Sequence, residues 1–188
     1  MRRPERAVVI GVMGSSASAV RDQSRRWLSG LARELGQLIA ERGCILVTGA
    51  TTGIPDIVCR SARAHGGLTI GISPAASRDD HVLGYRLPKD RSDVTIYTGF
   101  GVKGRNVINV RACDIVIILG GGLGSLNEFT IAYDEGKVVG VLEGTGGAAS
   151  RVRELAGLST SRTKARLVFE SSPSKLVDAC LEAFFKTG

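Results

Sequence analysis

The sequence alternates short apolar runs, rich in valine and isoleucine, with stretches of helical periodicity. The expected strands cover residues 7–12, 44–48, 68–72, 94–97, 115–119, 138–142 and 167–169, and the expected helices include 27–39, 55–65, 104–113 and 173–185. In residues 27–39 the apolar side chains, Trp27 among them, recur every three or four positions and should face the sheet. Strands that alternate with helices pair in parallel. The pattern therefore predicts an α/β fold, a doubly wound and mostly parallel sheet with helices on both faces.

The composition fits a single globular domain over residues 1–188, with 43% hydrophobic, 23% charged and 5% aromatic residues and no internal repeat or linker. No apolar stretch approaches the roughly 18 residues that a membrane-spanning helix needs. The first residues also lack the apolar core of a signal peptide. We therefore expect a cytoplasmic protein with no membrane partner.

The net charge of +7 raises the question of nucleic-acid binding. The basic residues are spread along the chain, and no aromatic residues are interleaved with them, which argues against a nucleic-acid partner. A mildly basic protein that binds small anionic ligands is the simpler interpretation. The cysteines and histidines are widely separated and lack metal-ligand spacing, so we expect no metal site and interpret the cysteines as small buried hydrophobes.

The most unusual segment, residues 120–128 (GGGLGSLNE), directly follows the apolar run 115–119. A strand, a glycine turn and a helix start in this order aim backbone amides and the positive end of a helix dipole at one point, which suits a phosphate. The alternative is that Ser125 and Glu128 only cap the start of the helix, because they have the spacing of a capping box. Capping does not explain four glycines in five positions, since each glycine loses conformational freedom on folding. We favour a phosphate-binding turn formed by Gly120, Gly121, Gly122, Gly124 and Ser125.

Small and hydroxyl-bearing residues also follow the first two strands. They are Gly14, Ser15 and Ser16 after the first strand, and Gly49, Thr51, Thr52 and Gly53 after the second. Ligands of open α/β sheets bind at the carboxyl ends of the strands, so the three turns should converge on one ligand. The hydroxyls could bind ribose or phosphate, or could serve only as turn and cap residues.

Two common nucleotide-binding motifs are absent. The first turn lacks the Gly-x-Gly-x-x-Gly pattern and the second strand does not end in an acid, which disfavours NAD. No Gly-Lys-Ser/Thr triplet is present, which disfavours a triphosphate-binding loop. A mononucleotide or another singly phosphorylated ligand fits better.

Arg105 lies at the expected start of the helix that precedes strand 115–119. A cation gains nothing from the positive end of a helix dipole, so its position suggests another partner. A carboxylate or a phosphate would serve, and an exposed, unpaired arginine is the alternative.

Residues 120–128 resemble the Pro-Gly-Gly-x-Gly-Thr-x-x-Glu motif of the LOG (Lonely Guy) proteins, which are cytokinin-activating phosphoribohydrolases, and Arg105 falls where that family has its upstream arginine. Segments 48–55, 104–109 and 126–133 are similar to a bacterial LOG-like branch that also includes molybdenum cofactor carrier proteins. The likeness extends from about Val8 to Gly147, and the two motifs together are more specific than either alone. It implies a Rossmann-like fold, a homo-oligomer (dimer or tetramer) and a nucleotide phosphate held by the glycine turn.

In the hydrolase members the motif glutamate and arginine are catalytic. Carried over to this chain, Glu128 would steady an oxocarbenium-like ribose or activate water, and Arg105 would orient the substrate. No cofactor would be required, and molybdenum cofactor would enter only as a carried ligand. Such proteins are often called lysine decarboxylases, but no lysine-centred motif for pyridoxal phosphate is present, so we reject that activity.

The chain departs from the hydrolase motif at three positions. Gly120 replaces the proline, Ser125 replaces the threonine, and Asn106 stands where hydrolases commonly carry lysine. We interpret the first two changes as mild, while the third weakens the case for catalysis more than the case for binding. Two hypotheses follow: a hydrolase that cleaves the N-glycosidic bond of a nucleoside 5′-monophosphate, or a non-catalytic carrier or sensor of a phosphorylated pterin or nucleotide.

Overall fold

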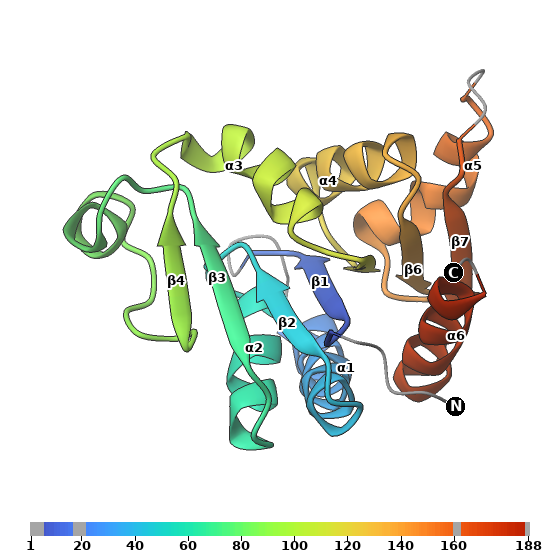
Figure 1. Ribbon diagram of the computed structural model, residues 1–188, viewed down its shortest axis with the longest axis horizontal. Helices are drawn as coiled ribbons and strands as arrows, with labels where there is room; N and C mark the ends of the chain where they lie inside the picture. Colours follow the sequence, from blue (N-terminus) through green and yellow to red (C-terminus); the bar gives the residue numbers. More distant parts are fainter. Residues whose placement is uncertain (1–5, 17–21, 160–162, 187–188) are drawn as a thin grey trace.

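The computed structural model describes residues 6–16, 22–159 and 163–186. Its seven strands form one parallel sheet in the order β4-β3-β2-β1-β5-β6-β7 (Figure 1). The strands are β1 (Val9–Gly14), β2 (Ile45–Thr48), β3 (Thr69–Ser73), β4 (Val94–Tyr97), β5 (Ile115–Leu119), β6 (Val138–Leu142) and β7 (Arg166–Glu170). The strand order reverses between β1 and β5, so a ligand crevice is expected at the carboxyl ends of these two strands.

Helices pack against both faces of this sheet. They are α1 (Asp22–Glu41), α2 (Ile54–Ala64), α3 (Gly101–Arg111), α4 (Leu123–Asp134), α5 (Val152–Ala156) and α6 (Pro173–Phe185), with a π-helix η2 (Asp80–Gly84) and a 3-10 helix η3 (Gly147–Arg151). One apolar core joins α1, α2 and α6 to one face, and a second joins α3, α4 and α5 to the other. Ile117 of β5 belongs to the first core and Ile118 to the second. Burial on both faces explains why this strand is continuously apolar.

The predicted α/β architecture is confirmed; β4, β5 and β6 have the expected bounds, and the bounds of the other strands differ by one or two residues. All four cysteines are buried free thiols, as expected. The prediction that Trp27 faces the sheet is wrong, because its side chain is 51% exposed and lies beside Gly144. The short helices η2, η3 and α5 were not predicted, since five residues are too few to show a helical period.

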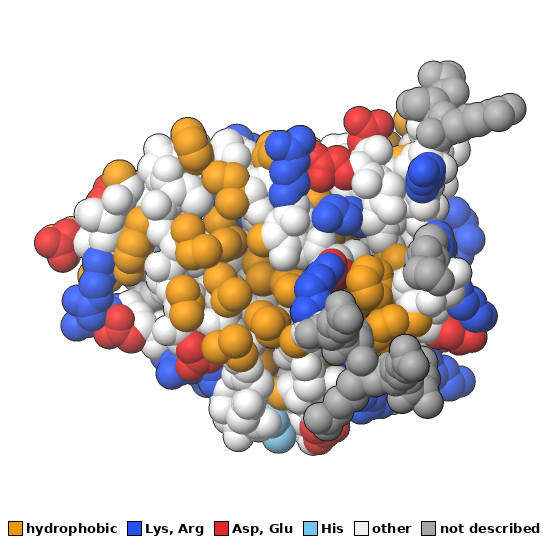
Figure 2. All heavy atoms as spheres, in the orientation of Figure 1, with side chains coloured by type: hydrophobic (Ala, Val, Ile, Leu, Met, Phe, Trp, Pro, Cys, Tyr) orange, Lys and Arg blue, Asp and Glu red, His pale blue; other side chains and the backbone are white. Residues whose placement is uncertain are grey.

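Part of the sheet carries no helix on one side. In Figure 1 no helix crosses in front of β3 and β4, and Figure 2 shows apolar side chains gathered over that area. Val94 and Ile96 of β4 are about half exposed, and Phe100 and Val102 at the start of α3 are exposed as well. These four residues define what we call the apolar sheet face.

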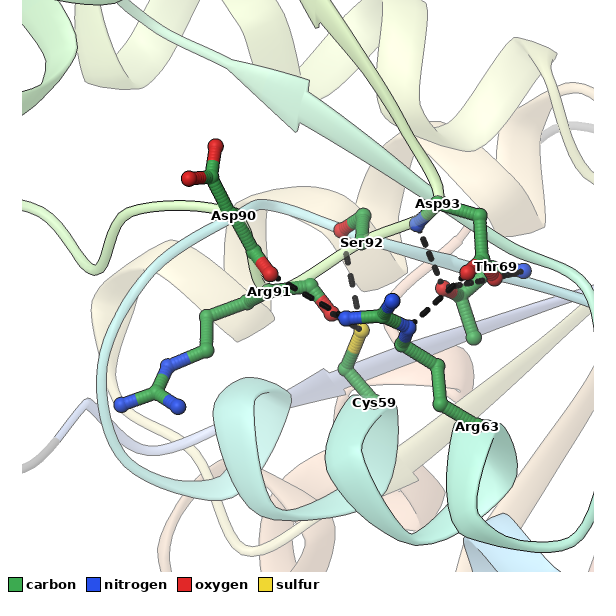
Figure 3. Close-up of polar contacts among 7 residues, drawn as sticks. All are labelled: Cys59, Arg63, Thr69, Asp90, Arg91, Ser92 and Asp93. Carbon is green, nitrogen blue, oxygen red and sulfur yellow. Dashed lines mark hydrogen bonds and ion pairs between the residues drawn. The ribbon is translucent and has the colours of Figure 1, made fainter.

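Hydrogen bonds hold the carboxyl end of the long irregular segment 74–93 against α2 (Figure 3). Arg63 of α2 donates to the Asp93 carboxylate at 2.9 Å and to the carbonyls of Asp90 and Arg91 at 3.1 Å. Asp93 also accepts from the amide and hydroxyl of Thr69 at the start of β3. These contacts hold the end of the segment and the start of β4 against the sheet.

None of the helices in the described ranges is long and apolar enough to cross a membrane.

Candidate functional site

The turns that follow β1, β2 and β5 meet at the carboxyl edge of the sheet. The Ser15 hydroxyl accepts a hydrogen bond from the Gly121 amide at 2.9 Å, and the Ser15 carbonyl accepts one from the Ile54 amide at 2.9 Å. A Cβ on Gly49 would lie 2.2 to 2.4 Å from the Arg105 guanidinium. The structure thus brings together the three turns that the sequence singled out.

The first two glycines of the turn after β5 use their backbone groups within the protein. The Gly120 amide donates to the Thr145 hydroxyl and the Gly121 amide donates to Ser15, both at 2.9 Å. Their carbonyls accept from the amides of Ala149 and Ala148 in η3. Gly120 and Gly121 therefore shape the turn and do not offer amides to a phosphate.

Gly120 also shows that the loss of the motif proline is not a mild change. Its φ is +60°, whereas a proline ring fixes φ near −65°. A proline would moreover lack the amide hydrogen that binds Thr145. Our interpretation of this replacement as mild is therefore wrong, because the turn has a backbone that the proline-bearing motif cannot adopt at this position.

The amides that remain for an anion are those of the first turn of α4. Gly122 is the N-cap with no side-chain cap hydrogen bond, and the helix begins at Leu123. Gly122 and Gly124 face open space, since a Cβ on either would meet no atom within 4 Å. The N-terminal amides of a helix and its dipole favour an anion. The phosphate-binding prediction thus narrows to Gly122, Gly124 and Ser125.

The capping-box alternative does not hold. Ser125 is the third residue of α4 rather than its N-cap, and the Glu128 side chain bonds to Arg105 and Asn109 instead of reaching back to a cap amide. Ser125 is buried with only 3% exposed.

The remaining predicted residues surround this edge with different roles. Gly14 packs tightly, because a Cβ there would lie 2.6 Å from Ile54. Gly53 is the N-cap of α2 with φ +83°. Thr51 and Thr52 are half-buried in the turn after β2, and Ser16 is exposed after β1. Their part in ligand binding stays a prediction.

Arg105 and Glu128 form a buried ion pair between α3 and α4. Arg105 Nη1 lies 3.0 Å from Glu128 Oε1, and the two side chains are 7% and 8% exposed. Asn109 Nδ2 donates to the same Oε1 at 2.9 Å. The alternative of an exposed, unpaired Arg105 is therefore wrong. Gly49 is required beside the pair, since a side chain there would occupy the position of the guanidinium.

Burial changes the proton affinity of both members of the pair. Desolvation raises the pKa of Glu128 above its ordinary value, against the opposing effects of Arg105 and Asn109. Desolvation also lowers the pKa of Arg105, although Glu128 opposes this shift. A carboxyl group with a raised pKa has the property that a general acid or base requires.

Two buried atoms next to this pair have no hydrogen-bond partner among the described residues. They are Arg105 Nε and Asn109 Oδ1. An unpaired buried polar atom costs about 1–3 kcal/mol, so native proteins keep few of them. Both atoms belong to residues that bond to the Glu128 carboxylate.

Sequence reasoning missed three residues of this region. Asn109 lies four positions after Arg105 and hence on the same helix face, a spacing that could have identified it. Thr145 and Gly147 hold the glycine turn, and a Cβ on Gly147 would lie 2.2 Å from the Gly121 carbonyl. No local pattern marks them, because their contacts lie about 25 residues away in the sequence.

A LOG-like protein has a parallel, doubly wound sheet. A glycine turn and a buried Arg–Glu pair lie where the order of its strands reverses. The chain belongs to the SLOG cluster4 family, whose model matches residues 7–177. The LOG-like resemblance drawn from the motifs is thereby confirmed.

Individual relatives include both binding proteins and a hydrolase. The molybdenum cofactor binding protein of Rippkaea orientalis is 30% identical with a TM-score of 0.72, over 95% of this chain and 98% of that one. The molybdenum cofactor carrier protein of Chlamydomonas reinhardtii is 25% identical with a TM-score of 0.69, over 96% and 99%. A cytokinin riboside 5′-monophosphate phosphoribohydrolase of Mycobacterium tuberculosis is 35% identical over 108 residues, which span 56% of this chain and 54% of that protein.

Proposed function

We propose that the protein binds a nucleoside 5′-monophosphate with its phosphate at the start of α4 and hydrolyses the N-glycosidic bond. The single observation that carries this proposal is the buried carboxylate of Glu128, paired with Arg105 at 3.0 Å. A site that only binds a phosphate gains nothing from a carboxylate nearby, because like charges repel. A site that develops positive charge on a ribose ring does gain from one.

The proposed reaction assigns one role to each group. Water attacks C1′ of the ribose while the bond from C1′ to the base nitrogen breaks, and the electron pair leaves with the base. Glu128 accepts the proton of the water or stabilises the positive charge at C1′, and Arg105 orients the substrate. The departing base takes up a proton, and ribose 5-phosphate remains.

The test is release of free base and ribose 5-phosphate from a panel of nucleoside 5′-monophosphates, measured by chromatography. Glu128→Gln should lower the rate by a factor of about 10² to 10⁴. The matched control is Glu135→Gln, which removes the exposed carboxylate that Arg111 binds between the same two helices and should leave the rate unchanged. Absence of base release from every nucleotide, under conditions in which the protein binds them, would overturn the proposal.

A second candidate function is non-catalytic carriage of a phosphorylated pterin such as molybdenum cofactor. Two features of this chain favour it: Asn106 in place of the hydrolase lysine, and the φ of +60° at Gly120. Molybdenum cofactor binding and carrier proteins are also among its structural relatives. The helix start that accepts a nucleotide phosphate would equally accept the phosphate of a pterin.

The carrier function is tested by mixing the protein with molybdenum cofactor released from a molybdoenzyme and measuring retained molybdenum after gel filtration. Retention near one equivalent that Gly124→Asp reduces would support carriage, because the new carboxylate faces the anion site. Gly30→Asp, in the open middle of α1, is the control. No retention would exclude this candidate.

We further propose that the chain is a homo-oligomer, a dimer or tetramer, that buries the apolar sheet face. Side chains such as Phe100 and Ile96 are unusually exposed for apolar residues of a folded chain. Light scattering should give a multiple of the 19.8 kDa chain mass, and Ile96→Lys should reduce it. A monomer at micromolar concentration would refute the proposal.

A further inference from the structure

Asn109 is a wholly buried polar residue whose side-chain nitrogen, Nδ2, donates two hydrogen bonds. It lies one helical turn after Arg105 on α3 and is 0% exposed. Its Nδ2 donates to Glu128 Oε1 at 2.9 Å and to the sulfur of Met13 in β1 at 3.2 Å. Two acceptors on one nitrogen fix the plane of the amide, because its two N–H groups have different partners.

The hydrogen bonds to Glu128 are distributed unequally between its carboxylate oxygens. Arg105 Nη1 and Asn109 Nδ2 both donate to Oε1, and neither donates to Oε2. A carboxylate held in this way has one anchored oxygen and one that is left for another partner. The anchored oxygen faces α3, which leaves Oε2 as the oxygen that can act on a ligand.

We propose that Asn109 is a positioning residue for Glu128, an inference that rests on the hydrolase function proposed above. Asn109 anchors Oε1 together with Arg105, so that Oε2 faces the attacking water or the ribose. It acts through Glu128 and does not touch the substrate. Preorganisation of this kind matters because a catalytic group misplaced by about 1 Å loses much of its effect.

A neighbouring hydrogen bond, between Asn106 and Asn127, is a purely structural contact between the same two helices. Asn106 Nδ2 donates to Asn127 Oδ1 at 2.8 Å, also between α3 and α4, but it does not contact Glu128. The Asn109 contact has almost the same length, yet it ends on an ionisable group. A change at Asn109 should therefore alter the titration of Glu128, whereas a change at Asn127 should alter stability alone.

The charged groups that act on Glu128 within the described residues are Arg105 and Lys103, both on α3. Cys113, which follows the same helix, stays neutral because burial raises its pKa to about 12. Asn109→Asp would add a carboxylate at the position of the donor. Like charges at hydrogen-bond distance disfavour the ionised form, so the pKa of Glu128 would rise further.

The first test compares the pH dependence of kcat/KM for the unaltered protein, Asn109→Asp and the control Asn127→Ala. Asn109→Asp should move the acidic half-maximum upward by about one pH unit or more, and Asn127→Ala should leave it in place. If Asn109→Asp does not fold, as judged by circular dichroism, Asn109→Ser replaces it. The serine variant should lower kcat with KM unchanged, because the anchored oxygen is released while substrate contacts remain.

The second test does not require catalysis. Carbon-13 NMR of side-chain carboxyl groups, with the Glu128 signal assigned from Glu128→Gln, follows the titration directly. If no nucleotide is hydrolysed but Asn109→Asp or Asn109→Ser shifts the Glu128 titration and Asn127→Ala does not, the hydrolase function fails and the positioning role stands. If the titration is the same in all four proteins, the positioning role is overturned.

Discussion

Two arginine–glutamate contacts join α3 and α4, one near the middle of both helices and one at their carboxyl ends, and they differ in burial rather than in length. Arg105 and Glu128 lie 3.0 Å apart with side chains 7% and 8% exposed, whereas Arg111 and Glu135 lie 2.7 Å apart with side chains 67% and 25% exposed. The second pair keeps part of its hydration, mainly at Arg111. The buried pair has lost it, so Arg105 and Glu128 depend on each other, and Glu128 depends on Asn109 as well. Distance alone therefore does not distinguish a buried ion pair from a solvated one.

The largest expected effect on stability comes from breaking the two pairs separately. Arg105→Met leaves the Glu128 carboxylate buried without its cation and should lower the free energy of unfolding by about 3–5 kcal/mol. Arg111→Met should lower it by about 1 kcal/mol or less, because water replaces the lost partner. Urea denaturation of both variants measures the difference. Equal losses would show that burial does not distinguish the two pairs.

An intermediate effect is expected from a methyl group beside the buried pair. Gly49→Ala places a Cβ within 2.4 Å of the Arg105 guanidinium and must displace it from Glu128. The expected cost is about 1–3 kcal/mol, with loss of base release. Gly30→Ala is the matched control, because its Cβ meets no atom within 4 Å and alanine favours a helix, so stability should rise by about 0.5–1 kcal/mol. Full base release by Gly49→Ala would contradict the assigned position of Arg105.

The smallest effect is the pH dependence of stability, and it should have opposite signs at two carboxylates. Burial raises the pKa of Glu128, so the stability it contributes is present in acid and is lost as the pH rises through the folded-state value. At Asp93 burial is outweighed by hydrogen bonds from Thr69 and the charge of Arg63, which lower its pKa. Its contribution is present above the ordinary aspartate range and is lost as the pH falls.

Urea denaturation from acid to neutral pH tests both signs. Relative to the unaltered protein, Glu128→Gln should gain stability as the pH rises, and Asp93→Asn should lose it. Each change should amount to about 1 kcal/mol or less, since Asp93 is partly exposed and Glu128 keeps a compensating cation. A Glu128→Gln difference that is independent of pH would contradict the raised pKa.

Much of this architecture was predictable because it depends on local patterns. The continuous apolar run of β5 and the glycines after it fixed a strand and a helix start, and Arg105 and Glu128 were identified from motif spacing. The use of the amides of Gly120 and Gly121 was not predictable. It depends on Thr145 and Ser15, which reach the turn from about 25 and 106 residues away in the sequence. Backbone groups give no sequence signal of whether they are already paired.

The position of Trp27 is a second feature that the sequence did not predict. Helical periodicity assigned it to the buried stripe of α1, although the buried residues of that stripe begin at Leu28 and continue through Leu35 and Ile39. Periodicity indicates which face of a helix is buried, but not where that face ends.

Trp27 is the one tryptophan in the chain, so the tryptophan fluorescence of the protein comes from this residue alone. Its indole lies beside Gly144, next to the threonine whose hydroxyl holds the amide of Gly120. An indole that is half in water changes its emission when its surroundings change. The molecule thus contains an intrinsic optical reporter close to the glycine turn, and ligand titrations can be followed by fluorescence without attaching a dye.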